Sequence, residues 1–215
     1  MNGSKPILRW AAPGLILAVA AIGLTGCVTL FPKAIPAQLY RFQVAAPETQ
    51  ASAPAAAEPM VSVVRATTSF ARGAESDQIL TADGDQLAYI AGARWIAPAV
   101  SLFDEAESQA FDQSATHVRL ARRGEFVNAP VSLRLDVETF EARYADGPKA
   151  APTVTIQVRA ILTRVADRKV IAERTFDSRK PASDNRVGPI VSGFDAAITD
   201  VLGQVVTWTD AQTTS

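Results

Sequence analysis

The stretch Val131-Ser132-Leu133-Arg134-Leu135-Asp136-Val137-Glu138 alternates strictly between apolar and polar residues. Successive side chains of a β-strand point to opposite faces, so this pattern predicts a strand with one buried face and one exposed face. The same alternation returns at residues 154–162, and a turn at 166–169 leads into a partner strand at 170–176. These segments predict that an antiparallel sheet is the framework of the fold.

Shorter segments with strand character precede this framework. They are residues 38–42, 61–66, 78–81, 86–90 and 117–120. Two of them, 78–81 and 86–90, flank the dipeptide Asp83-Gly84, which suits the positive φ of a tight turn. The sequence therefore predicts a β-hairpin at this position.

Two segments have the apolar periodicity of helices. Residues 98–112 begin with Pro98, which suits a first helical turn, and carry Leu102, Phe103, Ala106 and Ala110 at helical spacing. A second helix is expected from about Pro189, with a stripe that runs from Ile190 to Trp208 in steps of three or four residues. The polar face of this second helix has no Lys or Arg, which argues against a membrane-surface helix and favours core packing. The sum is an α+β domain in which two helices cover one face of a largely antiparallel sheet.

The composition excludes several classes of function. The 215 residues include 21 Lys+Arg and 22 Asp+Glu, so no excess of positive charge is available to offset the phosphates of a nucleic acid. One Cys rules out an intramolecular disulfide, and one His rules out a His-rich metal site. The chain has no phosphate-binding glycine motif, so an ATP-driven process would need its motor in another subunit.

The N-terminus has the layout of a secretory signal. Lys5 and Arg9 precede a short apolar run at residues 15–22, which ends in Leu24-Thr25-Gly26-Cys27. The run is too short for a membrane span, which needs roughly 20 apolar residues. Residues 1–26 are therefore expected to be a signal peptide, residues 27–37 a tether, and residues 38–212 the folded domain. Residues 45–59 are rich in Ala and Pro and predict a long loop within that domain.

The sequence Leu24-Thr25-Gly26-Cys27 resembles the lipobox of bacterial lipoproteins. The resemblance implies cleavage between Gly26 and Cys27, a diacylglycerol thioether on the Cys27 thiol, and acylation of its new amine. An Asp after the lipidated Cys is the usual signal for inner-membrane retention in enteric bacteria. Val28 stands there, which favours the outer membrane, with the domain facing the periplasm.

No pattern of residues supports a catalytic, cofactor-binding or metal site. His117 lies near Ser114 and Asp112 in the sequence, but no nucleophile motif accompanies it, so it is interpreted as a surface or strand-end residue. Asp136 and Glu138 share the polar side of one strand, among charged neighbours, whereas paired-carboxylate catalysis needs one partner that is buried. Two further charged groups are interpreted as solvated surface: the acidic residues Asp104, Glu105 and Glu107, and the basic pair Arg122-Arg123.

The order of several segments resembles that of the ABC-type transport auxiliary lipoproteins, including the PqiC-like proteins that accompany Mce-type lipid transporters. The segments are the lipobox, 39–42, 86–89, 94–98 and 170–176, followed by the final amphipathic helix. The resemblance implies a non-enzymatic accessory or scaffold subunit that works with an Mce-domain protein and an ABC permease and ATPase. The Ala/Pro-rich loop at 45–59 departs from the family's pattern.

The remaining predictions concern contacts. Trp95, with Ile96 and Phe103, is a candidate interaction surface, and the alternative is that Trp95 packs in the core. Two other functions stay open: an outer-membrane assembly or pilot lipoprotein, and a periplasmic carrier with a lipid-binding cavity. The sequence also leaves homo-oligomerisation open.

Overall fold

The computed structural model describes residues 36–45, 60–122, 124–125 and 127–213. Within these ranges, nine strands form one sheet. The strands are β1 (Gln38–Tyr40), β2 (Val61–Arg65), β3 (Ser69–Phe70), β4 (Gln78–Asp83), β5 (Gln86–Trp95), β6 (Val118–Leu120), β7 (Val131–Arg143), β8 (Thr153–Arg164) and β9 (Val170–Pro181). Two helices, α2 (Ala99–Ser114) and α3 (Val187–Thr213), complete the described part of the chain.

The strand that contains the alternating sequence, β7, lies at the centre of this sheet. One edge of β7 pairs antiparallel with β8 over the whole length of β7, and β8 pairs antiparallel with β9. The other edge pairs in parallel with β2, β3 and β4 in turn. The sheet is mixed, but its long ladders are antiparallel and each parallel ladder has only two or three residue pairs. The predicted α+β class is therefore confirmed.

The strict alternation predicted for β7 breaks at Glu138. The register between β7 and β8 shifts between Val137 and Thr139, so the chain has one extra residue at this point. The bulge reverses the phase of burial, and Phe140 and Ala142 continue the buried face. The aromatic side chain of Phe140 is thereby directed into the core.

β1, β5 and β4 form one side of the sheet, next to β7. β1 pairs in parallel with the end of β5, with Leu39 opposite Arg94. The hairpin predicted around Asp83-Gly84 is present, because β4 and β5 pair antiparallel and Gly84 has a φ of 57°. The predicted loop at 45–59 lies almost wholly outside the described residues.

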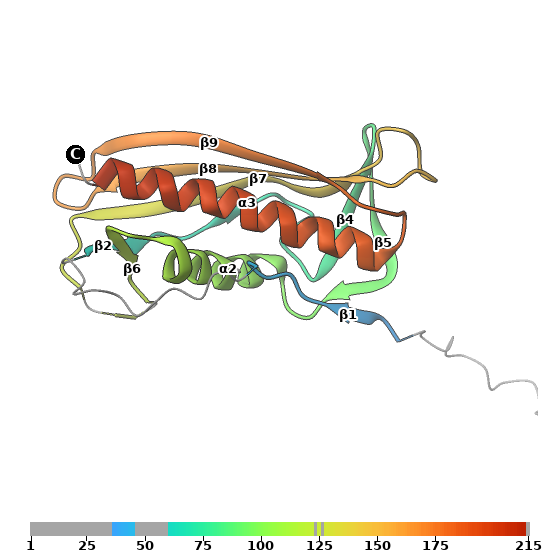
Figure 1. Ribbon diagram of the computed structural model, residues 1–215, viewed down its shortest axis with the longest axis horizontal. Helices are drawn as coiled ribbons and strands as arrows, with labels where there is room; N and C mark the ends of the chain where they lie inside the picture. Colours follow the sequence, from blue (N-terminus) through green and yellow to red (C-terminus); the bar gives the residue numbers. More distant parts are fainter. Residues whose placement is uncertain (1–35, 46–59, 123, 126, 214–215) are drawn as a thin grey trace, which may run out of the picture. The chain divides into compact units, whose positions relative to one another are not determined.

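Both helices pack over the sheet (Figure 1). α3 contacts β8, β9 and α2, whereas α2 contacts α3 and β6. The apolar stripe of α3, from Ile190 to Trp208, is buried. Of the described helices, only α3 has the length and hydropathy of a membrane span, and its buried stripe is typical of a core helix.

An aromatic cluster fills the space between α3, α2 and the sheet. Phe194 of α3 lies 4.9 Å from Phe140 and 5.2 Å from Trp95, measured between ring centroids. Phe42 packs edge-on against Trp95 at 5.0 Å, which fixes the chain that follows β1. Each aromatic pair at such a distance stabilises the fold by about 0.5–1.5 kcal/mol beyond the free energy gained from burying the apolar area of the rings. The cluster therefore links β1, β5, β7 and α3.

Polar contacts fasten the two ends of α3. Near its C-terminus, the Asp210 carboxylate accepts hydrogen bonds from the backbone N–H groups of Thr116, His117 and Val118, at 2.9–3.1 Å. These three donors join the end of α2 to the start of β6, so Asp210 secures that connection. In the N-terminal half of α3, Asp195 accepts a 3.1 Å bond from the backbone N–H of Gln43.

Two glycines of α3 provide a matched test of this packing. A Cβ on Gly193 would lie 2.9 Å from Cγ2 of Val154, whereas a Cβ on Gly203 would meet no atom within 4 Å. Val154 is fully buried on β8 and has no room to retreat. We expect Gly193→Ala to lower the free energy of unfolding by about 1–3 kcal/mol, because it overpacks this contact. Gly203→Ala is expected to raise it by about 0.5–1 kcal/mol, because alanine favours the helix.

Urea denaturation of both variants measures these changes. Equal effects of the two substitutions would contradict the close approach of α3 to β8.

Candidate functional site

A groove of about 490 Å³ opens beside β2. Its walls are the chain that leaves β2, the N-terminal half of α2 and the loop that follows β6. The lining residues are Val64, Arg65, Ala66, Thr67, Thr68, Val100, Ser101, Asp104, Ala121, Arg122, Gly124 and Glu125. A smaller hollow of about 300 Å³ shares Arg65, Ser101 and Asp104 with it. The groove is bordered by polar, charged and small apolar side chains, whereas the smaller hollow is bordered by polar and charged side chains.

A buried ion pair lies next to this groove. Nε of Arg65 is 2.7 Å from Oε2 of Glu107, whose side chain is 1% exposed. The other end of the guanidinium donates a 2.7 Å hydrogen bond to Oγ of Ser108. Glu107 and Ser108 follow Asp104 by three and four residues, so all three side chains share one face of α2. The helical spacing thus brings Glu107 and Ser108 against one arginine of β2, with Asp104 one turn earlier on the same face of α2.

Asp104 adds a second link between α2 and the chain that leaves β2. Its Oδ1 accepts a 2.9 Å hydrogen bond from the hydroxyl of Thr68. The backbone oxygen of Asp104 also accepts a 3.0 Å bond from the hydroxyl of Ser108. The Thr68–Asp104 bond, with the Arg65–Ser108 bond, joins the α2 wall of the groove to the wall formed by β2 and the chain that leaves it.

Burial raises the pKa of Glu107 to about 7. The positive charge of Arg65 acts in the opposite direction, and the negative charge of Asp104 adds to the increase. Desolvation outweighs the ion pair because the hydration free energy that a carboxylate loses on burial exceeds its attraction to one nearby cation. Neither carboxyl oxygen of Glu107 has a hydrogen-bond partner of good geometry among the described residues. Glu107 is therefore a proton-binding group near neutral pH.

Glu107 corrects one sequence prediction. The acidic residues of α2 were expected to form a solvated face, but Glu107 is fully buried, whereas Glu105 is exposed. The sequence held a signal for this outcome. Glu107 lies four residues after Phe103 and three before Ala110, which places it on the apolar stripe of α2.

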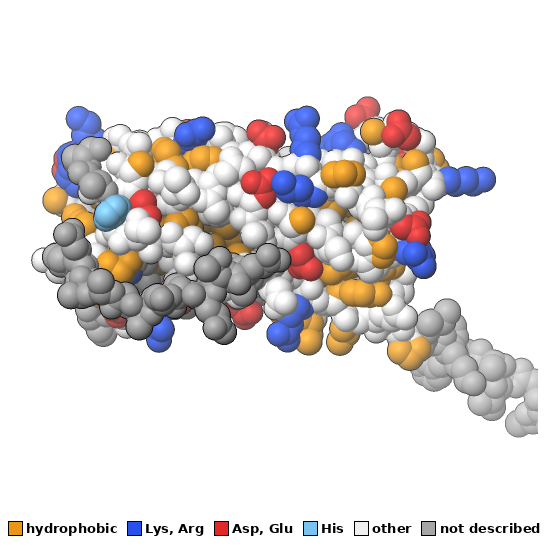
Figure 2. Space-filling view, viewed as in Figure 1, with side chains coloured by type: hydrophobic (Ala, Val, Ile, Leu, Met, Phe, Trp, Pro, Cys, Tyr) orange, Lys and Arg blue, Asp and Glu red, His pale blue; other side chains and the backbone are white. Residues whose placement is uncertain are grey.

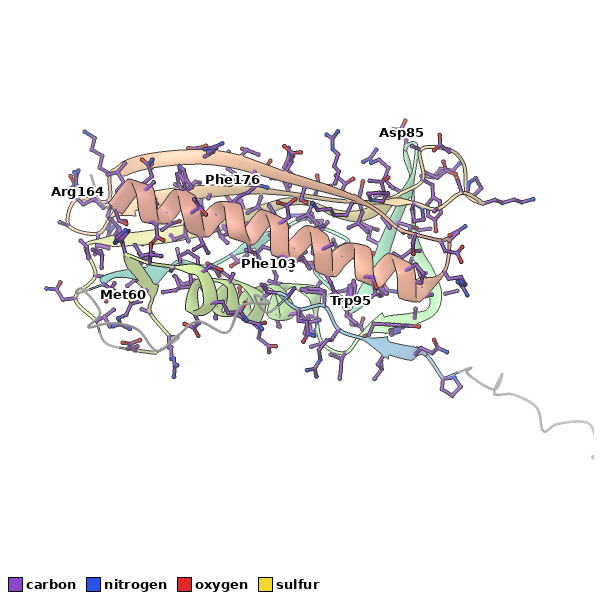
Figure 3. All side chains as sticks on the ribbon, viewed as in Figure 1. Met60, Asp85, Trp95, Phe103, Arg164 and Phe176 are labelled. Atoms are coloured by element: carbon purple, nitrogen blue, oxygen red, sulfur yellow. The ribbon has the colours of Figure 1, made fainter. Side chains whose placement is uncertain are left out.

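The predicted interaction surface is also corrected in part. Trp95 and Phe103 are 1% and 0% exposed and lie in the hydrophobic core, between α3 and the elements beneath it (Figure 3). Trp95 belongs to the aromatic cluster, and Phe103 joins it through Phe70, which lies 5.8 Å from Phe103 and 5.2 Å from Phe140 between ring centroids. Of the three residues, only Ile96 is exposed, at 51%. The alternative that Trp95 packs in the core is confirmed.

Three other residues that the sequence analysis considered make contacts within the fold. The backbone N–H of His117 donates to Asp210, at the start of β6. Asp136 lies 3.1 Å from the guanidinium of Arg134. The backbone N–H of Arg122 donates to the carboxylate of Glu125. None of these contacts joins a nucleophile to a base.

Some predictions cannot be placed in this fold. Gly26 and Cys27, the predicted cleavage and lipidation residues, lie outside the described residues, as does Arg123. Within the described ranges, no three His, Cys, Asp or Glu side chains form a group that could hold a metal ion. The described geometry therefore supplies a groove and a proton-binding carboxyl.

Residues 40–206 match the family described as the ABC-type transport auxiliary lipoprotein component. The match spans more than half of the chain, and the protein belongs to this family. It is accordingly an accessory component of ABC transport, and its lipoprotein family associates it with the cell envelope.

The solved structures that resemble this fold include the following two. Protein XCC0632 from Xanthomonas campestris, of the family DUF330, is 28% identical with a TM-score of 0.68, and the match covers 82% of this chain and 97% of that chain. The hypothetical protein CT253 from Chlamydia trachomatis is 8% identical with a TM-score of 0.51, covering 72% of this chain and 98% of that chain. The second likeness shows a shared fold only. No curated protein matches this chain.

The raised pKa of Glu107 predicts a pH dependence of stability. Between pH 4.5 and about 7, the folded chain holds a proton on Glu107 that the unfolded chain has released. The stability from this proton is fully present below pH 4.5 and is lost as the pH rises through 7. We expect it to amount to about 1–3 kcal/mol. Glu107→Gln should remove this contribution from the slope of the free energy of unfolding against pH, as measured by urea denaturation from pH 4.5 to 8.

Glu105→Gln is the matched control, because Glu105 lies two residues away on the exposed side of α2. It should keep the slope of the unaltered protein. A Glu107→Gln profile that is parallel to that of the unaltered protein would show that Glu107 does not titrate in this range.

Proposed function

We propose that this chain is a lipid-anchored periplasmic accessory subunit of an Mce-type ABC lipid transport system. The observation that carries the proposal is the combination of a lipobox at residues 24–27 with a family match that begins at residue 40. The family supplies the link to ABC transport, and the lipobox supplies the means of attachment. The subunit acts as a scaffold without catalysis of its own.

The proposed anchor is the acylated Cys27. Each buried methylene group stabilises membrane binding by about 0.8 kcal/mol, and a single acyl chain holds a protein only marginally. A lipoprotein Cys carries a diacylglycerol and an acylated amine, so its several chains make release negligible. Val28 after this Cys supports anchoring in the outer membrane, with the domain in the periplasm.

The proposed partner is an Mce-domain protein that spans the periplasm. An inner-membrane permease and ATPase would provide the energy, which agrees with the absence of a phosphate-binding motif from this sequence. The lipoprotein would hold or organise the end of the Mce bridge at the opposite membrane.

The structure favours this role over a lipid carrier. The groove beside β2 is bordered by Arg65, Asp104, Arg122 and Glu125, whereas an acyl chain requires an apolar cavity. Beneath the N-terminal half of α3, the aromatic cluster fills the space between the helix and the sheet. We therefore assign contact with other proteins, rather than lipid storage, to the domain.

The anchor is tested by Cys27→Ser. We expect the unaltered protein in the outer-membrane fraction and the variant as an unprocessed, unacylated precursor, because the lipid is attached through the Cys thiol. Cell fractionation and the intact mass of the purified protein measure this. Thr29→Ser is the control and should behave as the unaltered protein. Normal processing and membrane retention of Cys27→Ser would refute the anchor.

The partner is tested by purification of the tagged full-length lipoprotein after mild detergent extraction. An Mce-domain protein should co-purify with it, and should be lost when the lipoprotein is Cys27→Ser. Recovery of a β-barrel or secretin in place of the Mce protein would instead support an assembly or pilot lipoprotein.

A further inference from the structure

An apolar patch with basic residues lies on the outward side of the β1–β5 pair. Leu39 is 61% exposed and Ile96 is 51% exposed. Leu39 pairs with Arg94, and the backbone N–H of Ile96 donates to the carbonyl of Tyr40, so these side chains are neighbours on adjacent strands. Arg41 follows two residues after Leu39, on the same side of the chain, and is also exposed. We call Leu39, Arg41, Arg94 and Ile96 the β1 face.

The β1 face rests on a rigid support. The residues that alternate with it point inward, and Trp95 is 1% exposed. Trp95 packs against Phe42 on one side and Phe194 on the other. Because these rings are held in the core, Leu39 and Ile96 are presented in fixed positions. Figure 2 shows hydrophobic side chains gathered at the lower right, where the described chain begins.

The β1 face is also the part of the domain that follows the proposed anchor in the sequence. Eleven residues separate Cys27 from Leu39. Even fully extended, this length of chain reaches about 40 Å at most. An anchored bilayer therefore stays near the β1 face at high effective concentration, and contacts too weak to bind a free protein become sufficient.

We infer that the β1 face is a membrane-contact surface, which lies in the interface of the bilayer that holds Cys27. Leu39 and Ile96 enter the boundary between headgroups and acyl chains. The guanidinium of Arg41 lies at the level of the lipid phosphates, together with Arg94, which is paired with Asp77 at 2.9 Å. The inference rests on the anchor in the proposed function and adds a defined orientation of the domain to it.

This orientation has a consequence for the opposite end of the domain. Trp95 packs near the start of α3 and Asp210 lies near its end, and a 27-residue helix is about 40 Å long. The turn between β8 and β9 lies at the end of the domain where α3 finishes, as the position of Arg164 in Figure 3 shows. This turn carries the exposed Val165, and the first residues of β9 are the exposed Val170 and Ile171. With the β1 face on the bilayer, these residues point into the periplasm and are available to a protein partner.

Single-site fluorescent labelling of the acylated full-length protein tests the inference. Acylation occupies Cys27, the chain's only Cys, so an introduced Cys is the sole free thiol. Ile96→Cys and the matched control Val165→Cys, which is 48% exposed at the opposite end, each carry an environment-sensitive label. The proteins are reconstituted in vesicles of phosphatidylethanolamine and phosphatidylglycerol that contain nitroxide-labelled lipid.

An interfacial surface enters the headgroup and acyl boundary by about 5–10 Å, which brings the label at residue 96 within reach of the nitroxide. We expect that label to be quenched by the lipid and blue-shifted, and the label at 165 to remain quenchable by aqueous iodide. Leu39→Asp should reverse the behaviour of the label at 96, and Val170→Asp should leave it unchanged.

Three outcomes would overturn the inference. Labels at both positions that stay accessible to iodide, on vesicle-bound protein, would show that the tether holds the domain clear of the bilayer. Lipid quenching at 165 alone would reverse the orientation. A label at 96 shielded from both quenchers would show that protein covers the β1 face. The vesicles contain no transporter, so each result is independent of whether an Mce protein is the partner.

Discussion

The packing of α3 against the long strands is the interaction on which the rest of the structure depends. The helix buries its stripe from Ile190 to Trp208 on β8 and β9, and each Val, Leu, Ile or Phe side chain in it contributes about 1.5–3 kcal/mol when fully buried. Gly193 allows the helix to approach Val154 closely, and Phe194 beside it enters the aromatic cluster. Asp210 then fixes the junction of α2 and β6, so one helix positions both ends of the domain.

The packing of the core also determines the properties of the groove and of the Arg65–Glu107 ion pair, which both lie beside β2. Arg65 and Glu107 come from a strand and a helix that are held together by the core, not by their own attraction. Burial raises the pKa of Glu107 to about 7, so the pair gives the fold little net stability near neutral pH. Its contribution is rather to fix how α2 lies against β2 and, with Thr68 and Asp104, to shape the groove.

This arrangement gives the two ends of the domain different exposed surfaces. In the proposed arrangement, β1 joins the lipidated tether to the sheet, and its outward side carries apolar and basic residues suited to a lipid interface. The turn between β8 and β9 presents exposed aliphatic side chains at the end where α3 finishes. An accessory subunit that must hold a partner at a membrane needs both a fixed orientation and a free end. The length of α3 separates the two.

The sequence by itself determined the elements whose signals are local. The alternation in β7 and β8, the Asp83-Gly84 turn and the stripe of α3 are each contained in a few neighbouring residues, as is the sequence that resembles a lipobox. The tertiary structure alone decided that β7 pairs in parallel with β2, β3 and β4, that Glu107 is buried on Arg65, and that Trp95 is in the core. The physical reason is that periodicity states which side of a segment is apolar. Which distant segment covers that side, and which charge is buried with it, depends on contacts between residues far apart in the chain.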